Sequence, residues 1–252
     1  MPVPELRVIP VTGVPEVKAG DDLGRLLAEA ARRQGTPLQD RDVLVVTQKI
    51  VSKAEGRVVR LDRVTPSELA RTIALQWEKD PRHVEVVLRE SRRIVRMDHG
   101  VLITETKHGF VCANSGVDAS NVPGGDLVAL LPEDPDASAA RVRESVRIVA
   151  SVDVAVLVSD SFGRPWRMGI TNVALGVAGM DPLRDERGKQ DAYGRLLQST
   201  IVALADELVS AADLVSQKAN NIPASIVRGF PYERKEGSGR ALLREAATDL
   251  FR

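Results

Sequence analysis

The stretch VLVSDSFGRPWRMG, residues 156–169, joins two kinds of sequence that rarely adjoin. It continues an apolar run that begins at Val154 and ends at Val158, and such a run is typical of a strand covered on both faces. Polar side chains follow at once, among them Asp160, Ser161 and Arg164. Ligands of α/β proteins usually bind where core strands end, so the stretch predicts a buried sheet with a site at its edge.

The elements predicted on both sides of this strand alternate in type. They are a helix over residues 23–31, a strand over Val43–Thr47, strands over 102–104 and 110–113 around a turn at 107–109, helices over 139–149 and 197–208, a strand over 224–227 and a terminal amphipathic helix over 242–250. Segment 123–137 is either a surface connection between lobes or a plain turn. This order favours an α/β (mixed α+β) architecture over an all-helical or all-β one.

A further helix is predicted to begin within Thr65-Pro66-Ser67-Glu68. The segment has a capping residue, a proline suited to the first helical position and a glutamate suited to a capping box. Leu69, Ile73 and Trp77 follow at helical spacing and are expected to form the apolar face.

Composition limits the possible functions. A chain of 252 residues, of which 43% are hydrophobic, can bury a substantial core and fits one large domain or two small intertwined ones. Lys plus Arg and Asp plus Glu number 35 each, so no overall charge favours nucleic acid or an anionic membrane. The one cysteine, Cys112, excludes a disulfide framework and a zinc cluster and fits a small buried side chain. No apolar run is long enough to span a membrane, so we expect no exported or membrane-inserted segment, and the single cysteine fits a reducing cytoplasm.

Two apolar runs each lead into an aspartate. Residues 110–113 precede NSGVDASNVPGG (114–125), which carries Asp118, and the opening strand precedes Asp160. Paired carboxylates beside hydroxyls and amides suit Mg²⁺ or Mn²⁺, which proteins usually share with substrate phosphates. The alternative is that each aspartate closes a turn or caps a helix, and spacing alone leaves both open.

The segment VTQKIVSKAEGR, residues 46–57, contains positively charged side chains. Lys49 and Lys53 are four residues apart, so on a helical turn they project the same way and could receive a phosphate. A surface turn exposed to solvent would contain the same residue types, so both interpretations stay open. The chain has no Walker A sequence, and GSGRAL at 237–242 lacks the third glycine of a dinucleotide fingerprint, so any nucleotide is held in another way.

Four blocks of the chain together resemble the F420-0:γ-glutamyl ligase family, also called coenzyme F420-0:L-glutamate ligases. The blocks are LRVIPVTGVPEVKAGDDL (6–23), VVTQKIVSKAEGR (45–57), LITETKHGFVCANSGVDASNV (102–122) and VSDSFGRPWRMGITNVALGVAGM (158–180). They occur in the family's order over nearly the whole chain. The resemblance implies one ligase domain over residues 1–252, without the nitroreductase-like domain that follows it in some actinobacteria.

The resemblance also implies a reaction and a fold. The enzyme would use GTP to join L-glutamate to the deazaflavin precursor F420-0 through an acyl phosphate, and would then add further γ-linked glutamates. It would need Mg²⁺ or Mn²⁺, with two ions expected, and K⁺ as a helper. Its fold would be a homodimer with two intertwined lobes around a mixed sheet. The alternatives are another nucleotide-dependent carboxylate–amine ligase or phosphotransferase on the same scaffold, and a non-catalytic nucleotide-binding regulator.

The resemblance also implies site residues, at the positions of this chain that match the family's motifs. Asp118, Asp160 and Lys53 would be catalytic, and Asp118, Asp160 and Ser161 would bind metal. The nucleotide would contact Val14, Pro15, Glu16, Val17, Gln48, Lys53, Asn121 and the segment SQKANNI, which comprises Ser216, Gln217, Lys218, Ala219, Asn220, Asn221 and Ile222.

Four other residues keep two interpretations each. His108 is either an acid, base or substrate contact or a bystander. Arg164 and Arg167 either hold a substrate phosphate or carboxylate or form structural ion pairs. Trp166 either packs on a deazaflavin ring or, as we expect, lies in the core.

Overall fold

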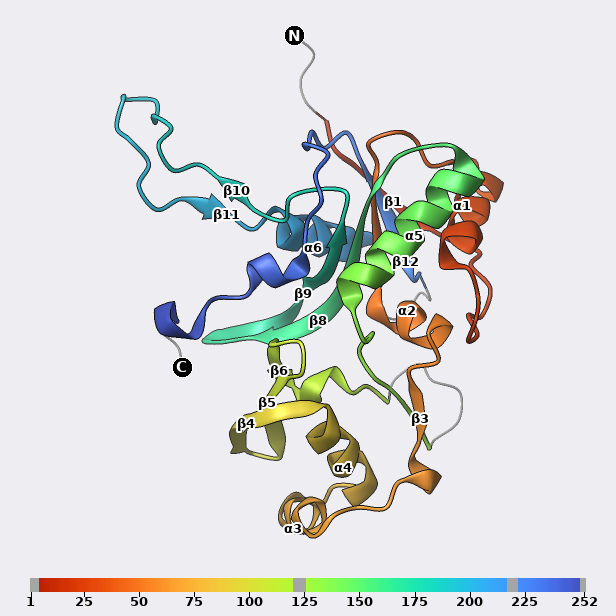
Figure 1. The fold of residues 1–252 in the computed structure, drawn as a ribbon, viewed down its shortest axis with the longest axis vertical. Helices are drawn as coiled ribbons and strands as arrows, with labels where there is room; N and C mark the ends of the chain where they lie inside the picture. The colour runs from red at the N-terminus through yellow and green to blue at the C-terminus, as the bar shows by residue number, and fades with distance from the viewer. Residues whose placement is uncertain (1–4, 120–125, 217–221, 250–252) are drawn as a thin grey trace.

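A mixed five-stranded sheet forms the centre of the larger lobe in the computed structural model, which describes residues 5–119, 126–216 and 222–249 (Figure 1). The strands, in spatial order, are β1 (Arg7–Val11), β12 (Ala224–Arg228), β2 (Val43–Thr47), β8 (Ala155–Arg164) and β9 (Arg167–Ala178). β2 and β8 run parallel, and the other neighbours are antiparallel. The predicted mixed α/β class is confirmed.

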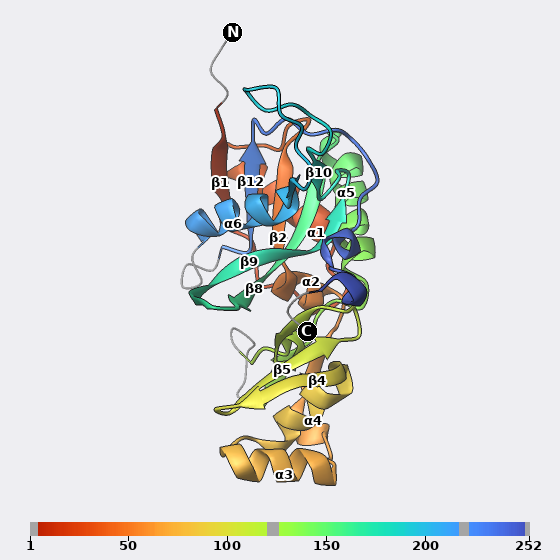
Figure 2. The ribbon, with the colours of Figure 1, turned by 90° about the vertical axis from the view of Figure 1, so that its left-hand side faces the viewer.

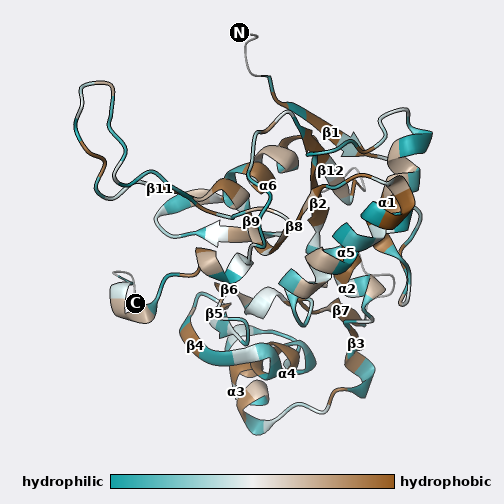
Figure 3. Ribbon diagram, turned by 45° about the horizontal axis from the view of Figure 1, so that its top comes forward, coloured by the Kyte–Doolittle hydropathy of each residue, from teal (hydrophilic) through white to brown (hydrophobic). Residues whose placement is uncertain are grey.

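Helices cover both faces of this sheet (Figure 2). α1 (Leu23–Arg33) and α5 (Pro135–Ala150) pack on the face that carries Leu44 and Val156. α6 (Leu204–Ser216) packs on the opposite face, against Val45 and Leu157. Alternate residues of each strand therefore enter different cores, which is why the central strands are apolar throughout, as the hydropathy colours of β12 and β2 show (Figure 3).

The smaller lobe is one continuous insertion between α2 (Gln48–Ala54) and α5. It contains α3 (Glu68–Trp77), α4 (Pro81–Glu90), the sheet of β4 (Ser91–Asp98), β5 (Val101–Thr106) and β6 (Val111–Ala113), and the paired strands β3 (Val58–Arg60) and β7 (Leu127–Ala129). Short 3-10 turns lie at Leu61–Arg63 and Asn114–Gly116. This lobe has its own apolar core, which includes Ile73, Val84 and Leu102, so it extends the chain below the main sheet as a second packed unit (Figure 1).

The start of α5 is held tightly against β9. A Cβ atom at Gly176 would lie 2.1 Å from the backbone oxygen of Pro135, so only glycine permits this approach. The Asp136 carboxylate accepts hydrogen bonds from the backbone N–H groups of Val177 (2.8 Å) and Gly239 (2.7 Å), which also anchors the C-terminal segment.

The opening strand is longer than predicted. We expected it to end near Val158, but β8 continues to Arg164, because β9 pairs with it along this whole length as a hairpin. Asp160 and Ser161 are therefore strand residues and do not belong to a loop. Trp166 lies at the hairpin turn with a φ of 56° and is 79% exposed, so its expected place in the core was wrong.

The helix predicted over 197–208 was wrong in its first half. α6 begins at Leu204. Leu197 exchanges backbone hydrogen bonds with residues 188 and 189, and β11 (Ile201–Val202) pairs with β10 (Arg184–Asp185), so this part of the chain is an extended ribbon. Long-range pairing of the backbone overrides the helical spacing of the leucines.

The terminal helix predicted over 242–250 was also wrong. The described part of this segment forms 3-10 turns at Gly239–Leu242 and Ala246–Thr248. Ala246 and Ala247 are exposed, so no continuous apolar stripe is buried, and a short helix without a packed face is not stable.

The start of α3 differs from its prediction by two residues. Ser67 is the N-cap and accepts a hydrogen bond from the Ala70 N–H at 3.2 Å, so Thr65 and Pro66 precede the helix. Leu69 is 56% exposed and does not belong to the buried face, whereas Ile73 does. Segment 123–137, expected to be a connection or turn, contains β7 and the start of α5 in its described part.

Candidate active site

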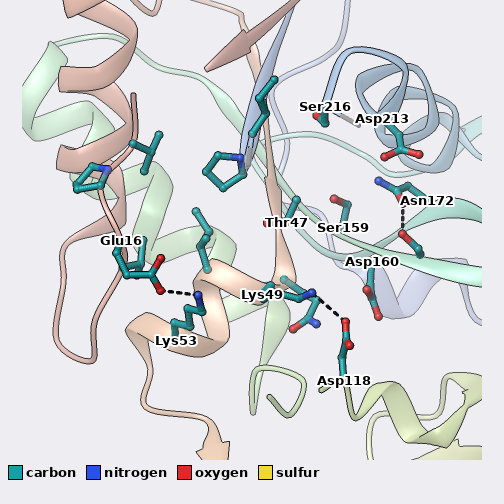
Figure 4. Close-up of a pocket in the computed structure, with 18 residues that line it drawn as sticks. Glu16, Thr47, Lys49, Lys53, Asp118, Ser159, Asp160, Asn172, Asp213 and Ser216 are labelled. Atoms are coloured by element: carbon teal, nitrogen blue, oxygen red, sulfur yellow. Dashed lines mark hydrogen bonds and ion pairs between the residues drawn. The ribbon is translucent and has the colours of Figure 1, made fainter. Parts of the chain in front are cut away.

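A pocket of about 350 Å³ opens where β2 ends and β8 continues beyond it, between the two lobes (Figure 4). The parallel pairing places Thr47 of β2 beside Ser159 of β8, so α2, which follows β2, lies beside the outer half of β8 at one edge of the sheet. The β8–β9 register shifts between Val158, which pairs with Gly176, and Ser159, which pairs with Ala174, so the extra residue is Leu175 of β9. Beyond this shift, Ser159, Asp160 and Ser161 of β8 all line the pocket.

Most of the residues proposed from the sequence line this one pocket. They are Val14, Pro15, Glu16, Val17, Gln48, Lys53, Asp118, Asp160, Ser161, Ser216 and Ile222. The remaining ones, Asn121, Gln217, Lys218, Ala219, Asn220 and Asn221, lie outside the described residues. Segments from five separate parts of the chain therefore converge, as the resemblance implied.

Two lysines project from α2 toward acidic side chains. Lys53 Nζ lies 2.6 Å from Glu16 Oε1, and Lys49 Nζ lies 2.9 Å from Asp118 Oδ2 (Figure 4). The Lys53 side chain is 12% exposed, so its charge is largely shielded from water. The expected helical spacing of the two lysines is confirmed, since α2 begins at Gln48 directly after β2.

The two aspartates come from different lobes. Asp118 follows the 3-10 turn of the smaller lobe, and its backbone exchanges hydrogen bonds of 3.0 and 2.8 Å with Ala129. Asp160 belongs to β8 of the larger lobe. The neighbouring Ser161 donates a hydrogen bond of 2.6 Å to Asn172 Oδ1 on β9. This bond fixes the side chains of Ser161 and Asn172.

The donor set fits a hard divalent cation. Asp118, Asp160 and Ser161 present carboxylate and hydroxyl oxygens, which Mg²⁺ and Mn²⁺ prefer. Ser159 is 2% exposed, and its hydroxyl has no hydrogen-bond partner among the described residues, so one more oxygen is available at the same edge. In the ranges that the structure describes, no three Asp, Glu, His or Cys side chains are grouped closely enough to hold a metal by themselves. A cation here would therefore need hydroxyl, water or phosphate oxygens to complete its coordination.

Cys112 does not supply a nucleophile. It is buried on β6, and burial, together with the negative charge of Asp160, raises the pKa of its thiol to about 12. A thiol with this pKa remains protonated and unreactive near neutral pH, in agreement with its predicted structural role.

His108 and the two arginines of the hairpin lie outside the pocket lining. His108 Nε2 is within hydrogen-bonding distance of the backbone oxygens of Pro132 (2.9 Å) and Glu133 (3.1 Å). Arg164 donates to the backbone oxygens of Met168 and Gly169, across its own hairpin turn. Both contacts favour structural roles for His108 and Arg164, although Arg164 contacts backbone oxygens and not the acidic side chain of the expected ion pair. Arg167 is exposed.

Sequence reasoning missed several lining residues. They are Thr47, Ile50, Ser159, Asn172, Asp213 and Pro223. Ser159 and Asn172 stand inside a quoted block and could have been found from the pairing of a hairpin. Asp213 is one acidic residue of a surface helix, and no local pattern distinguishes it from a solvated side chain.

Comparison with known proteins supports one family. The family model described as F420-0:Gamma-glutamyl ligase matches residues 13–229. A protein of Methanopyrus kandleri named Coenzyme F420:L-glutamate ligase is 48% identical, with 99% of each chain covered. Proteins of the same name from Methanothermobacter thermautotrophicus (98% of this chain, 99% of the relative) and Methanocaldococcus jannaschii (99% of each) are 45% and 41% identical. A match of this extent, on a chain whose pocket gathers the residues expected of the family, shows that the protein belongs to the F420-0:γ-glutamyl ligase family.

Proposed function

We propose that this protein uses GTP to add L-glutamate to coenzyme F420-0 and then adds further γ-linked glutamates. The names of its full-length relatives support glutamate ligation in coenzyme F420 biosynthesis. The observation that carries the proposal is the meeting of Lys49, Lys53, Asp118 and Asp160 in one pocket, although they come from both lobes. Cations and carboxylates arranged together suit a triphosphate and its divalent ion, because phosphoryl transfer is catalysed mainly by positioning and charge stabilisation.

The reaction has two balanced steps. The terminal carboxylate of F420-0 attacks the γ-phosphorus of GTP, so an acyl phosphate forms and GDP leaves. The amine of L-glutamate then attacks the acyl carbon, the amide C–N bond forms, inorganic phosphate leaves, and the nitrogen loses its excess protons to solvent. This activation is needed because a free carboxylate has no adequate leaving group.

Side chains of the protein would position the substrates and stabilise the negative charge on the transferred phosphoryl group. Lys53 and Lys49 would contact phosphate oxygens as point charges. Asp118, Asp160 and Ser161 would hold Mg²⁺ or Mn²⁺, with two ions expected, which neutralises charge on the transferred phosphoryl group. Phosphoryl transfer needs positioning more than a protein nucleophile, so a pocket lined by neither Cys nor His among the described residues is suitable. We also propose K⁺ as a helper ion.

The apolar part of the pocket lining is suited to the nucleotide base. Val11 pairs with Ala224, so the segments after β1 and before β12 leave the sheet side by side. They carry Val14, Pro15, Ile222 and Pro223 into the pocket lining. A base held between these two segments would direct its phosphates toward Lys53 and the aspartates.

A homodimer is part of the proposal. Large apolar side chains stand out from two projecting segments: Met168 at the β8–β9 hairpin is 93% exposed, and Tyr193 in the β10–β11 ribbon is 91% exposed. Surfaces of this kind are usually covered by a partner, and symmetric dimers are the commonest assembly.

Among the described residues no helix has the length and apolar character needed to cross a bilayer. With its one buried cysteine, the protein suits the cytoplasm.

The test is direct. Pure protein is incubated with GTP, Mn²⁺, L-glutamate and F420-0, and the products are analysed by mass spectrometry. We expect F420 species extended by one or more glutamates and one GDP for each amide bond. GTP binding without any product would indicate a regulator, and GTP turnover only with another carboxylate substrate would indicate a different ligase.

A further inference from the structure

The pocket contains one carboxylate that the proposed phosphoryl transfer does not use. Asp213 lies on α6 and lines the pocket (Figure 4). Within the described part of the chain, its side chain makes no hydrogen bond or ion pair, and the lysines of the pocket contact Glu16 and Asp118 instead. A carboxylate that has no counter-charge among the described residues, and that lines a ligand pocket, is available for a cationic group of a substrate.

The position of Asp213 is held by the packing of α6 on β9. Ser210 donates a hydrogen bond of 2.9 Å to the backbone oxygen of Asn172, and its hydroxyl also lies 3.1 Å from that of Thr171. Residues three apart share a helix face, so Asp213 lies one turn beyond Ser210 on the side that faces β9. In Figure 4, Asp213, Asn172 and Ser159 occupy the side of the pocket opposite Lys53 and Glu16.

Ser159 adds an acceptor that is built into this side. Its hydroxyl is buried and has no hydrogen-bond partner in the described ranges, although it lines an open pocket. Leaving a buried polar group unpaired is unfavourable, so a ligand that pairs with it gains affinity.

Asp213 does not belong to a three-carboxylate metal site. In the described ranges, Asp118, Asp160 and Asp213 do not form a group of acidic side chains that could hold an ion by themselves. An ammonium group needs no such cluster, and it fits one carboxylate with a neighbouring hydroxyl.

We propose that Asp213, with the Ser159 hydroxyl, binds the α-ammonium group of the incoming L-glutamate. This inference rests on the proposed function. An ammonium group has three N–H donors, which a carboxylate and a hydroxyl oxygen accept. The same nitrogen attacks in every round of addition, after the ammonium group has lost a proton to solvent, whereas the activated carboxylate changes from the F420-0 precursor to a glutamate side chain. One ammonium site can therefore serve all rounds.

The test compares two nucleophiles. L-Glutamate enters as an ammonium ion, whereas hydroxylamine is mostly uncharged near neutral pH and converts an acyl phosphate to a hydroxamate without an ammonium site. With saturating GTP, Mn²⁺ and F420-0, we expect Asp213→Asn to raise the KM for L-glutamate about 10- to 100-fold, the loss of a charged hydrogen bond. Hydroxamate formation should stay within about twofold of wild type, and Ser159→Ala should shift the glutamate KM in the same direction by a smaller factor.

Glu207→Gln is the matched control, because Glu207 is exposed on the same helix and does not line the pocket. It should change neither reaction. A wild-type KM for L-glutamate in Asp213→Asn overturns the inference. An equal loss of amide and hydroxamate formation overturns it too, because Asp213 would then act in GTP binding or in formation of the acyl phosphate. Wild-type protein that forms neither product overturns the proposed function and, with it, this inference.

Discussion

The ammonium nitrogen of Lys49 lies 2.9 Å from a carboxylate oxygen of Asp118, and this ion pair joins the larger lobe to the smaller one across the pocket. Both side chains are partly exposed, at 20% and 38%. Asp118 is also a residue expected to hold a divalent cation, so a bound ion and Lys49 would share its charge. The pair thus connects the arrangement of the lobes to the binding of metal and phosphate.

Lys49→Met should affect the reaction more than the fold. A partly exposed ion pair contributes only about 0–1 kcal/mol to stability, so we expect a melting temperature within a few degrees of wild type. Loss of one phosphate-binding charge should raise the KM for GTP about tenfold. Differential scanning fluorimetry and steady-state kinetics measure both. A large fall in melting temperature with an unchanged KM would assign Lys49 a structural role only.

Asp160→Asn and Asp118→Asn should each lower turnover by at least ~100-fold, because charge stabilisation at the metal supplies several kcal/mol of barrier reduction. Asparagine keeps the size of the side chain and closes turns equally well, so folding should be preserved. GDP release and thermal melts are measured on the same samples. A well-folded variant with wild-type turnover would remove that residue from the site.

Removal of divalent cations should abolish glutamate addition. We expect EDTA to stop turnover, and excess Mg²⁺ or Mn²⁺ to restore it, because the oxygen donors of the pocket suit these ions. The product should carry γ-linked glutamates, which chemical or enzymatic hydrolysis of the chain can establish. Turnover that persists in the chelator, or α-linked product, would contradict the proposed chemistry.

The smaller lobe should lose stability in acid through Glu85. Hydrogen bonds from Ser67 and then from the Arg89 guanidinium lower the pKa of the Glu85 carboxyl to about 2, from 4.5. A carboxylate with a lowered pKa stabilises the folded state fully above its unfolded pKa, and this contribution is lost as the pH falls from about 4.5 to 2.

Glu85→Gln should therefore lower the free energy of unfolding by about 2 kcal/mol at pH 7, and the difference from wild type should shrink below pH 4. Urea unfolding of both proteins across this pH range measures the difference. Glu68→Gln, on the exposed first turn of α3, is the control. A difference that is independent of pH would show that Glu85 acts through packing alone.

The protein should be a dimer in solution at micromolar concentration. Light scattering should give twice the mass of the 27.3 kDa chain. Met168→Lys places a charge on one of the exposed apolar segments and should weaken the dimer while leaving the cores of both lobes intact. A monomeric mass for the wild type would exclude this assembly.

Local patterns in the sequence were sufficient for most of the elements. The continuous burial of β2 and of the first half of β8 follows from their unbroken apolar runs. The apolar stripes of α1 and α5 follow from the helical spacing of their apolar residues. The Asp22 cap of α1 is equally local, since its carboxylate accepts from the Arg25 N–H three residues away. The nucleotide and metal residues, by contrast, came from the family resemblance and not from their spacing.

Only the tertiary structure decided which residues meet. Leu197 has helical spacing to α6, but the ribbon with residues 188 and 189 satisfies its backbone groups and makes it extended. Asp118 contacts Lys49 although it belongs to the smaller lobe, 69 residues further along the chain. Asp213 reaches the pocket because α6 packs on β9. Periodicity determines which face of an element is buried, whereas a site depends on long-range packing between elements, and that packing leaves no local pattern in the sequence.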